Sequence, residues 1–271
     1  MLSFKKTNNS RKIARVLDPK ALRIKGKNGK MKKAKDKFLY LSEHELDDEN
    51  VNNNLTEIKL PKGQKLQPMP NKNVVEKMYI SAPSGAGKST FVGNWLGEYN
   101  KMFKNGEIFI LSSIEEDAAL DSHEPIRIAL DAQIIEDPLD AEDMSDSVIV
   151  FDDVDTIQNV HLRKAVSGFR DYLLEQGRHF NIRMMMTSHL LMNYRDTRRI
   201  LNESTAVVFF PKSGSTYHIK IFLKTHAGLE SAQIKKILNL PSRWVALYKT
   251  YPLYIIHERG AFLLTTSDND F

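Results

Sequence analysis

The chain has 271 residues, which allows one large domain with appendages or two small domains, and its 41% apolar and 27% charged residues are ordinary values for a soluble globular protein. It contains no cysteine, so a disulfide framework and a thiolate metal site are excluded. We expect no membrane insertion and no secretion, because no apolar run approaches the roughly 18–20 residues that span a bilayer and no apolar segment follows the charged N-terminus.

The net charge of +5 is unevenly distributed along the chain. Residues 1–37 hold 14 lysines and arginines against two aspartates, so the rest of the chain is net negative. This segment has neither helical nor strand periodicity, and we expect a basic arm. Such an arm suits a polyanion such as nucleic acid, because neutralised phosphates release counterions, but a solvated, poorly ordered tail explains the charge equally well.

A connector follows the basic segment. Residues 41–54 are acidic and rich in asparagine, and residues 60–73 contain prolines and a glycine that mark a linker. We therefore predict two parts, an arm with its connector over residues 1–73 and a folded domain over residues 74–271.

The folded domain alternates strands and helices. Apolar runs predict strands at 76–81, 106–113, 126–130, 147–153, 182–189 and 206–212. Apolar residues at helical spacing predict helices at 88–103 and 161–177, the second capped by Gly177, and a polar helical segment precedes the last of these strands. This alternation predicts an α/β fold with a mostly parallel central sheet covered by helices. The character then changes, and we expect an antiparallel addition at the C-terminal sheet edge from residues 215–226, 229–240, 243–252 and 253–266.

The turn after the first predicted strand, residues 82–90, reads APSGAGKST. It fits the phosphate-binding pattern G-x-x-x-x-G-K-[ST] except at Ala82, which is tolerable if its φ angle is negative. Two glycines let backbone amides face a phosphate, Lys88 supplies a cation, Ser89 supplies a hydroxyl for Mg²⁺, and the following helix adds its dipole. The alternative is a chance surface turn. The residues predicted to bind a nucleotide are Ser84, Gly85, Ala86, Gly87, Lys88, Ser89 and Thr90.

Two acids end a buried strand at SVIVFDDVD, residues 147–155. At the carboxyl end of a strand, where ligands of open α/β sheets bind, Asp152 is placed to hold Mg²⁺. Asp153 is placed to orient and deprotonate the attacking water. A solvated strand end is the simpler interpretation of an isolated pair of aspartates.

A third segment, GRHFNIRMMMTSH, delivers Thr187, Ser188 and His189 at the end of a methionine-rich strand. If this strand lies between those that carry the loop and the acids, Ser188 or His189 faces the terminal phosphate or the attacking water. Taken alone, the methionines are core residues and His189 is an ordinary loop histidine.

Several other features are expected to have structural roles. Residues 115–146 hold twelve acids against Arg127 alone, which indicates a solvated insertion or a face turned away from DNA. Trp95 and Trp244 are expected in the core or at a subunit contact, not as base-stacking platforms. The histidines have no metal-ligand spacing.

In this order, SGAGKS, IVFDD and GRHFNIRMMMTSH resemble the HerA/FtsK superfamily of DNA-translocating ATPases. The similarity is closer to the genome-packaging ATPases of large double-stranded DNA viruses, which share a loop without the leading glycine, paired aspartates and a Thr-Ser-His. It continues through YRDTRRILNESTAVVFFPK and SRWVALYKTYPLYIIHERGAFLL, and covers roughly residues 75–265.

The resemblance implies a RecA-like P-loop NTPase that hydrolyses ATP with Mg²⁺, assembles into a ring of five or six copies with shared active sites, and moves double-stranded DNA into a preformed capsid. It further implies a capsid or portal-vertex partner and a location inside the host cell, at the site of virus assembly or in the virion. No counterpart of the dedicated DNA-reading domain of bacterial relatives is recognisable here, so the basic arm would contact DNA.

The resemblance also implies residue roles. Lys88 takes the phosphate position, Ser89 and Asp152 the magnesium positions, and His189 the sensor position. Asp153 stands where bacterial relatives have a longer catalytic glutamate. Arg178 matches the arginine of the superfamily's Gly-Arg segment and is the first candidate for a finger from the neighbouring subunit; its rivals are Arg195, Arg198 and Arg199.

Two other function classes remain open at this stage. One is a P-loop ATPase or kinase with no DNA-pumping role, although neither an acceptor pocket nor a lid is recognisable. The other is a non-hydrolysing adaptor between DNA and capsid. DNA stimulation of hydrolysis, phosphorylation of a small acceptor, or no hydrolysis at all distinguishes the three.

Overall fold

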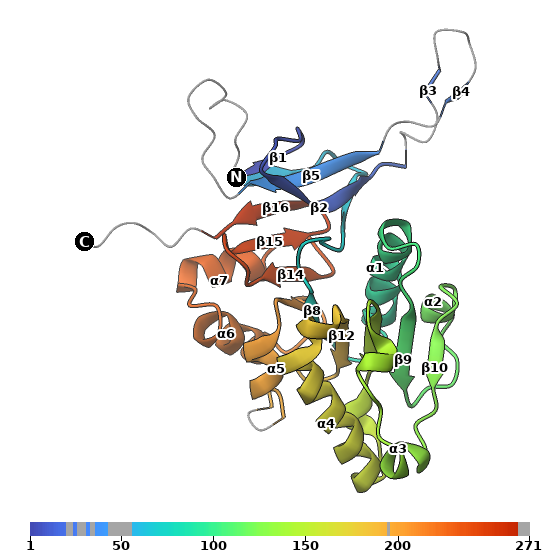
Figure 1. Cartoon of the computed structure of the whole chain (residues 1–271). Coiled ribbons are helices and arrows are strands. Elements are labelled where there is room, and N and C mark those ends of the chain that lie inside the picture. Colours follow the sequence, from blue (N-terminus) through green and yellow to red (C-terminus); the bar gives the residue numbers. More distant parts are fainter. Residues whose placement is uncertain (20–23, 26–30, 33–35, 43–55, 194–195, 265–271) are drawn as a thin grey trace.

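The structure, a computed structural model, is organised around one long sheet with a parallel and an antiparallel half (Figure 1). It describes residues 1–19, 24–25, 31–32, 36–42, 56–193 and 196–264. The parallel half consists, in spatial order, of β10 (Ile126–Ile128), β9 (Ile108–Ser112), β11 (Val148–Asp152), β12 (Arg183–Ser188), β8 (Lys77–Ser81) and β13 (Ala206–Phe209). The antiparallel half continues with β14 (Val245–Tyr248), β15 (Tyr254–His257), β16 (Gly260–Leu263) and β6 (Glu57–Lys59). The predicted α/β class is confirmed.

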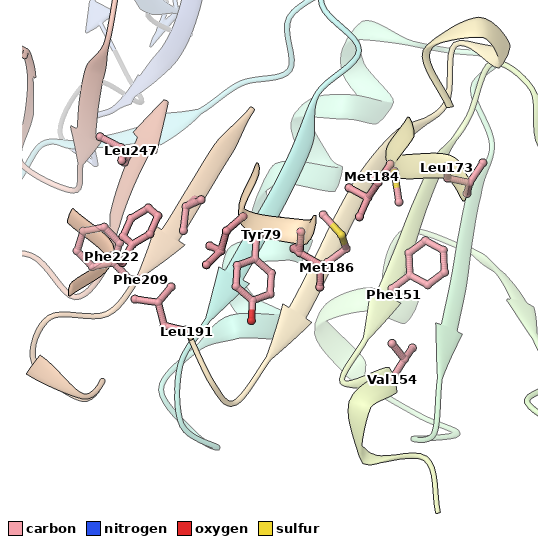
Figure 2. Packing of buried hydrophobic residues seen from close by; sticks show 14 of the residues in the cluster. Tyr79, Phe151, Val154, Leu173, Met184, Met186, Leu191, Phe209, Phe222 and Leu247 are labelled. Carbon is pink, nitrogen blue, oxygen red and sulfur yellow. The ribbon is translucent and has the colours of Figure 1, made fainter. Parts of the chain in front are cut away.

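Helices cover both faces of this sheet. On one face lies α1 (Lys88–Met102), whose buried side chains share a core with the N-terminal strands. On the other lie α4 (Val160–Gln176), α5 (Arg198–Glu203), α6 (Thr216–Thr225) and α7 (Ser231–Leu238). Figure 2 shows the second core, where Tyr79, Phe151, Met186 and Phe209 project from neighbouring strands.

Alternation along the strands explains their uniformly apolar sequences. Met184 and Met186 of β12 belong to the core under α4, whereas Met185 belongs to the core under α1. A parallel strand buried on both faces needs apolar residues at every position. The methionine run is therefore core, as one of the sequence interpretations had it.

Short elements connect the long ones at the β10 edge and beside the site. They are α2 (Ala118–Asp121), α3 (Gln133–Glu136) and the 3₁₀ turns η2 (Glu142–Met144), η3 (Val154–Thr156) and η4 (Gly177–Phe180). Gly177 is the C-cap of α4, as predicted, and the chain continues there into η4. In the part of the chain that the structure describes, no helix is long and apolar enough to cross a membrane.

The N-terminal segment corrects one prediction, because much of it is folded. A second, antiparallel sheet contains β1 (Leu2–Ser3), β5 (Lys37–Ser42), β2 (Ser10–Leu17) and β7 (Lys65–Pro68), and β3 (Ile24–Lys25) pairs with β4 (Met31–Lys32). A register shift between Lys12 and Ala14 leaves both Ile13 and Ala14 buried, which breaks the alternation by which a strand is recognised.

Its positive charges are partly engaged in this packing. The guanidinium of Arg15 lies 2.8 Å from the carboxylate of Glu98 on α1, and the ammonium of Lys12 lies over the ring of Phe38. Deleting residues 1–37 would therefore remove part of the core, not a detachable arm. The division of the chain at residue 73 stays a prediction.

The C-terminal third corrects a second prediction. Residues 215–226 and 229–240 form α6 and α7, not strands, whereas the two closing segments form the predicted antiparallel β14, β15 and β16. In α6 the buried residues are Ile219, Phe222 and Leu223, which is helical spacing, and the Ser215 side chain caps the first turn. The alternation of apolar and charged residues in IKIF favours a strand, but the Ser215 cap and the helical spacing of the buried residues favour the helix that forms.

Candidate functional site

The phosphate loop, residues 82–90, connects β8 to α1 at the carboxyl edge of the parallel strands. Gly85 and Gly87 have φ angles of +73° and +109°, a left-handed region in which side chains are strained. Ala82 has no positive φ and is buried, and its carbonyl accepts a hydrogen bond from Lys88 Nζ at 3.2 Å. The local geometry therefore suits the sequence at each of these positions, including the alanine.

Strand β12 lies between β11 and β8, which is the condition that the sequence analysis set. Ser188 is in register with Ser81, and Met186 with Phe151, so three strands end side by side. The amide of Ala82 donates to the carbonyl of Ser188 at 3.1 Å, which fastens the loop to the end of β12. The loop, the acids and the Thr-Ser-His consequently meet at one edge of the sheet.

Lys88, Asp153 and His189 form a closed triangle. Lys88 Nζ lies 3.3 Å from Asp153 Oδ2 and 3.4 Å from His189 Nδ1, and His189 Nε2 lies 3.1 Å from the same Oδ2. A neutral imidazole with its proton on Nε2 accepts from the ammonium and donates to the carboxylate, so one tautomer satisfies every contact. Lys88 is only 7% exposed, and its charge is thus compensated in a largely dry environment.

Asp152 lies beside this triangle and is held by two hydroxyls. Thr187 Oγ1 donates to Oδ1 at 2.8 Å, and Ser112 Oγ donates to Oδ2 at 3.0 Å. Burial raises the pKa of Asp152, the hydrogen bond from Thr187 opposes this, and the charge of Asp153 raises it further. A buried carboxylate that is costly to ionise is stabilised by a cation.

The oxygens of Asp152 and Ser89 fit magnesium as a ligand set. Mg²⁺ prefers oxygen donors and is commonly bound by one or two protein oxygens together with waters and substrate phosphates. Ser89 is the first hydroxyl of α1, next to Lys88, and Asp152 ends β11. The residues present are therefore compatible with the predicted magnesium role.

Asp153 has an unusual backbone. Its φ of +46° lies in the left-handed region, which non-glycine residues seldom adopt, and its amide donates to Thr187 Oγ1 at 2.9 Å. Thr187 Oγ1 also lies 3.1 Å from Asp153 Oδ1, but its single proton can serve only one of the two aspartates at a time. Such strain persists where surrounding contacts hold it, and here it turns the carboxylate toward Lys88.

The alternation of β12 places only one of the two sensor candidates beside Lys88. His189 projects toward Lys88, whereas Ser188 projects the other way and donates to Asp155 Oδ2 at 2.9 Å. Sequence analysis left both open because the phase of the strand relative to the loop is set by the sheet.

The candidate finger residues lie apart from the triangle. Arg178 is exposed in η4, which precedes β12, so the length of that strand, about 20 Å, separates it from the loop of its own chain. Arg198 and Arg199 are exposed on α5, and Arg199 pairs with Asp171 at 3.1 Å. Arg195 lies outside the described residues.

Sequence reasoning missed two supporting hydroxyls and an arginine. Ser112 ends β9 and was not singled out, and Thr187 was noted without its role of holding both aspartates. The sequence contained one signal for these two residues, because each carries a hydroxyl at the end of a predicted parallel strand. Arg243 comes close to Gly87, with its Nη2 3.7 Å from where a Cβ would stand there, and no local pattern pointed to it.

The chain matches no protein-family model. A protein of Sputnik virophage described as uncharacterized protein V3 is 41% identical over 208 residues, which are 76% of this chain and 83% of that protein.

Similar solved structures have lower sequence identity. B204, the DNA-packaging ATPase of Sulfolobus turreted icosahedral virus, has a TM-score of 0.47 with 12% identity and covers 68% of this chain and 98% of its own. The genome-packaging NTPase B204 of Sulfolobus turreted icosahedral virus 2 with ATP-gammaS has a TM-score of 0.43 with 9% identity, over 67% and 96% of the two chains. The pCW3 conjugation coupling protein TcpA with ATPgS has a TM-score of 0.44 with 10% identity, over 90% and 76%. These proteins are of the class that the sequence resemblance names, but at such scores the likeness does not carry a function to this chain.

Proposed function

The chain belongs to the family of protein V3 of Sputnik virophage, and from this premise we propose that it is an ATP hydrolase that drives double-stranded DNA into a preformed viral capsid. The observation that carries the proposal is the convergence of Lys88, Asp152, Asp153 and His189 on the phosphate loop. A cation, two acids and inward-facing amides at one sheet edge are the parts that phosphoryl transfer to water requires.

In this proposal the loop amides and Lys88 hold the phosphates, and Ser89 and Asp152 hold Mg²⁺. The ion, when bound, neutralises charge on the phosphate oxygens. Asp153 orients the attacking water and takes its proton, so its shorter side chain serves where relatives have glutamate. The terminal phosphate competes with Asp153 for Lys88, which opens the triangle and makes His189 a sensor of the nucleotide.

A second surface supports the DNA part of the proposal. A hollow of about 830 Å³ between α6 and α7 is lined by four lysines, Lys212, Lys220, Lys224 and Lys235, and no acid is among its described lining residues. Within the described chain none of the four pairs with a carboxylate. We call this surface the lysine groove. Unpaired lysines along a groove suit the phosphate backbone of DNA.

One end of the lysine groove is connected to the phosphate loop through the segment that follows β13. Phe210, directly after β13, comes within 3.8 Å of where a Cβ on Gly87 would stand, and Pro211 and Lys212 follow it into the groove. The acidic residues 115–146 lie around β10 and α3, at the edge of the sheet that is farther from the lysine groove (Figure 1). This separation fits an assembly in which the groove faces DNA and the acidic edge faces away.

The remaining parts of the proposal concern assembly. We propose a ring of five or six copies in which Arg178, or else Arg195, Arg198 or Arg199, completes the neighbour's site, since a guanidinium there is worth about 10³–10⁵ in rate. A capsid or portal-vertex protein would dock this ring at the site of virus assembly inside the host cell.

The test is the hydrolysis rate with and without linear double-stranded DNA over a range of salt concentrations. We expect stimulation that falls steeply with salt. The variant Lys220→Glu/Lys224→Glu/Lys235→Glu should keep basal hydrolysis, lose most of the stimulation and lower the salt slope of DNA binding by up to about three. The matched control reverses three exposed lysines elsewhere, Lys62→Glu/Lys72→Glu/Lys104→Glu, and should behave like the unaltered protein.

The outcomes distinguish the possible functions. Basal hydrolysis without any DNA stimulation would remove the translocase and leave an ATPase with another role. No hydrolysis at all, in assembled protein with Mg²⁺, would contradict the proposed enzyme. If the two triple variants lose DNA stimulation equally, DNA binding depends on the net charge of the protein and not on the lysine groove.

A further inference from the structure

A hollow of about 270 Å³ adjoins the phosphate loop on the side away from the acids. Its walls come from α1, the end of β13, the start of β14, and the N-terminal strands β2 and β7. In the sheet, β13 and β14 lie on one side of β8, and β12 and β11 lie on the other. The hollow and the Lys88–Asp153–His189 triangle therefore lie on opposite sides of the phosphate loop.

Aromatic rings line this hollow. Phe91 of α1 and Trp244 meet edge to face with their centroids 5.0 Å apart, and Phe210 stands beside Gly87. Trp244 is half-buried, so part of its indole remains accessible. Leu17 and Leu66 add apolar surface from the N-terminal sheet.

The position and chemistry of this hollow point to a ligand. The terminal phosphate belongs at Lys88 and Asp153, so the nucleoside, attached at the other end of the triphosphate, must leave the loop near Thr90, which lines the hollow. Flat heteroaromatic rings stack on aromatic side chains. We infer that the hollow is the nucleoside subsite, in which the base stacks against the half-buried indole of Trp244, while the buried ring of Phe91 supports that indole edge to face. This inference rests on the proposed nucleotide site and names what its second end binds.

Arg243 joins the two ends of the site. Its guanidinium reaches to 3.7 Å from where a Cβ on Gly87 would stand, a position suited to a phosphate oxygen. Its backbone amide donates to Glu258 Oε2 at 2.8 Å, and Glu258 Oε1 pairs with Lys65 Nζ of β7 at 3.0 Å. The N-terminal sheet thus closes the hollow and also fixes the segment that carries Arg243 and Trp244.

The inference is tested by comparing ATP with inorganic tripolyphosphate, both with Mg²⁺, in calorimetric titrations of the full chain. Base stacking on an aromatic side chain is worth about 1–3 kcal/mol, so Trp244→Ala should weaken ATP binding by about 5- to 150-fold and leave tripolyphosphate binding unchanged. Trp244→Phe should restore most of the affinity. Arg243→Ala, which removes a phosphate contact, should weaken both ligands.

A fluorescence measurement tests the stacking without altering Trp244, so a folding defect of the Trp244→Ala variant cannot affect the result. The chain has two tryptophans, and Trp95 is buried in the α1 core with its indole N–H unpaired among the described residues, which makes Trp95→Phe a mild change. In that variant Trp244 is the only tryptophan, and excitation at a wavelength that tyrosine does not absorb reports on it alone. ATP should change its emission, and tripolyphosphate should leave it unchanged.

Each outcome has one meaning. If ATP and tripolyphosphate bind equally, and ATP leaves the emission of Trp244 unchanged, the hollow is not a nucleoside subsite although the phosphate loop works as proposed. If neither ligand binds, the proposed nucleotide site itself is wrong. A loss of affinity for both ligands in Trp244→Ala would reveal a structural role for the indole and overturn the stacking.

Discussion

The two ends of the proposed nucleotide site are built in different ways. At the acid end, Asp152 ends β11, His189 directly follows β12 and Lys88 follows β8 after the phosphate loop, and hydroxyls of β12 and the neighbouring β9 hold Asp152. At the nucleoside end, the walls come from segments far apart in the sequence, including the N-terminal sheet. Phosphate chemistry is thus encoded in short local motifs, whereas the nucleoside subsite is created only by tertiary assembly.

Loss of the phosphate cation should have the largest effect. Lys88→Ala removes a buried charge that contacts the phosphates in the bound state and in the transition state, and we expect hydrolysis to fall by about 10³-fold. Steady-state hydrolysis measures this, with Lys101→Ala on the same helix as a control. Near-normal turnover in Lys88→Ala would show that the loop is not the reaction centre.

The next largest effect separates chemistry from binding. Asp153→Asn keeps the size of the side chain but cannot take a proton, so turnover should fall by about 10²-fold while ATP affinity stays within a few-fold. Single-turnover kinetics and equilibrium titration give the two quantities. A variant that loses affinity and keeps its turnover would assign Asp153 to binding.

The nucleoside end should be more sensitive to acid. His257 is the last residue of β15 and precedes Glu258, which lines the hollow. Burial lowers the pKa of His257 from 6.5 to about 4, and the Arg259 amide donates to its Nδ1 at 3.3 Å. The unfolded chain binds this proton first, so the contribution of His257 to stability is complete above pH 6.5 and is lost toward pH 4, by about 3 kcal/mol in unfolding free energy.

Urea unfolding between pH 7 and pH 4 measures this contribution. His257→Gln should flatten the decline relative to the unaltered chain. The same decline in both proteins would show that other groups cause the acid sensitivity.

The smallest expected signal tests whether sites are shared. Arg178→Ala and Lys88→Ala rings are each expected to be inactive, but a mixed ring places an intact loop beside an intact arginine. Random mixing in equal amounts should restore about a quarter of the sites. If mixing restores nothing, Arg178 is not the finger, and the same experiment passes to Arg198 and Arg199.

Sequence reasoning succeeded where neighbours in the chain decide the structure. The strand–loop–helix around Lys88 and the apolar strand before Asp152 followed from apolar runs and from the rules of parallel sheets. The position of β12 between their strands was only a condition in the sequence analysis, and the sheet order meets it. That His189, and not Ser188, lies beside Lys88 could not be predicted, because it depends on the phase of β12 against the loop.

It failed where distant segments decide the structure. The bulge in β2 concealed a strand among lysines, and the ion pair of Arg15 with Glu98 ties that strand to α1. Trp244 was expected in the core or at a subunit contact, and it does pack against the core that contains α1. Its place beside the loop was not predicted, because it arises from the position of β14 next to β13 in the sheet. No local pattern contains that information.

Photo-crosslinking with 8-azidoadenosine triphosphate tests most directly whether the two ends form one site. The account predicts labelling on the peptides that contain Phe91 or Trp244, suppressed by excess tripolyphosphate and absent in Lys88→Ala. Labelling confined to another surface, such as the hollow of about 920 Å³ between α4 and α5, would contradict it.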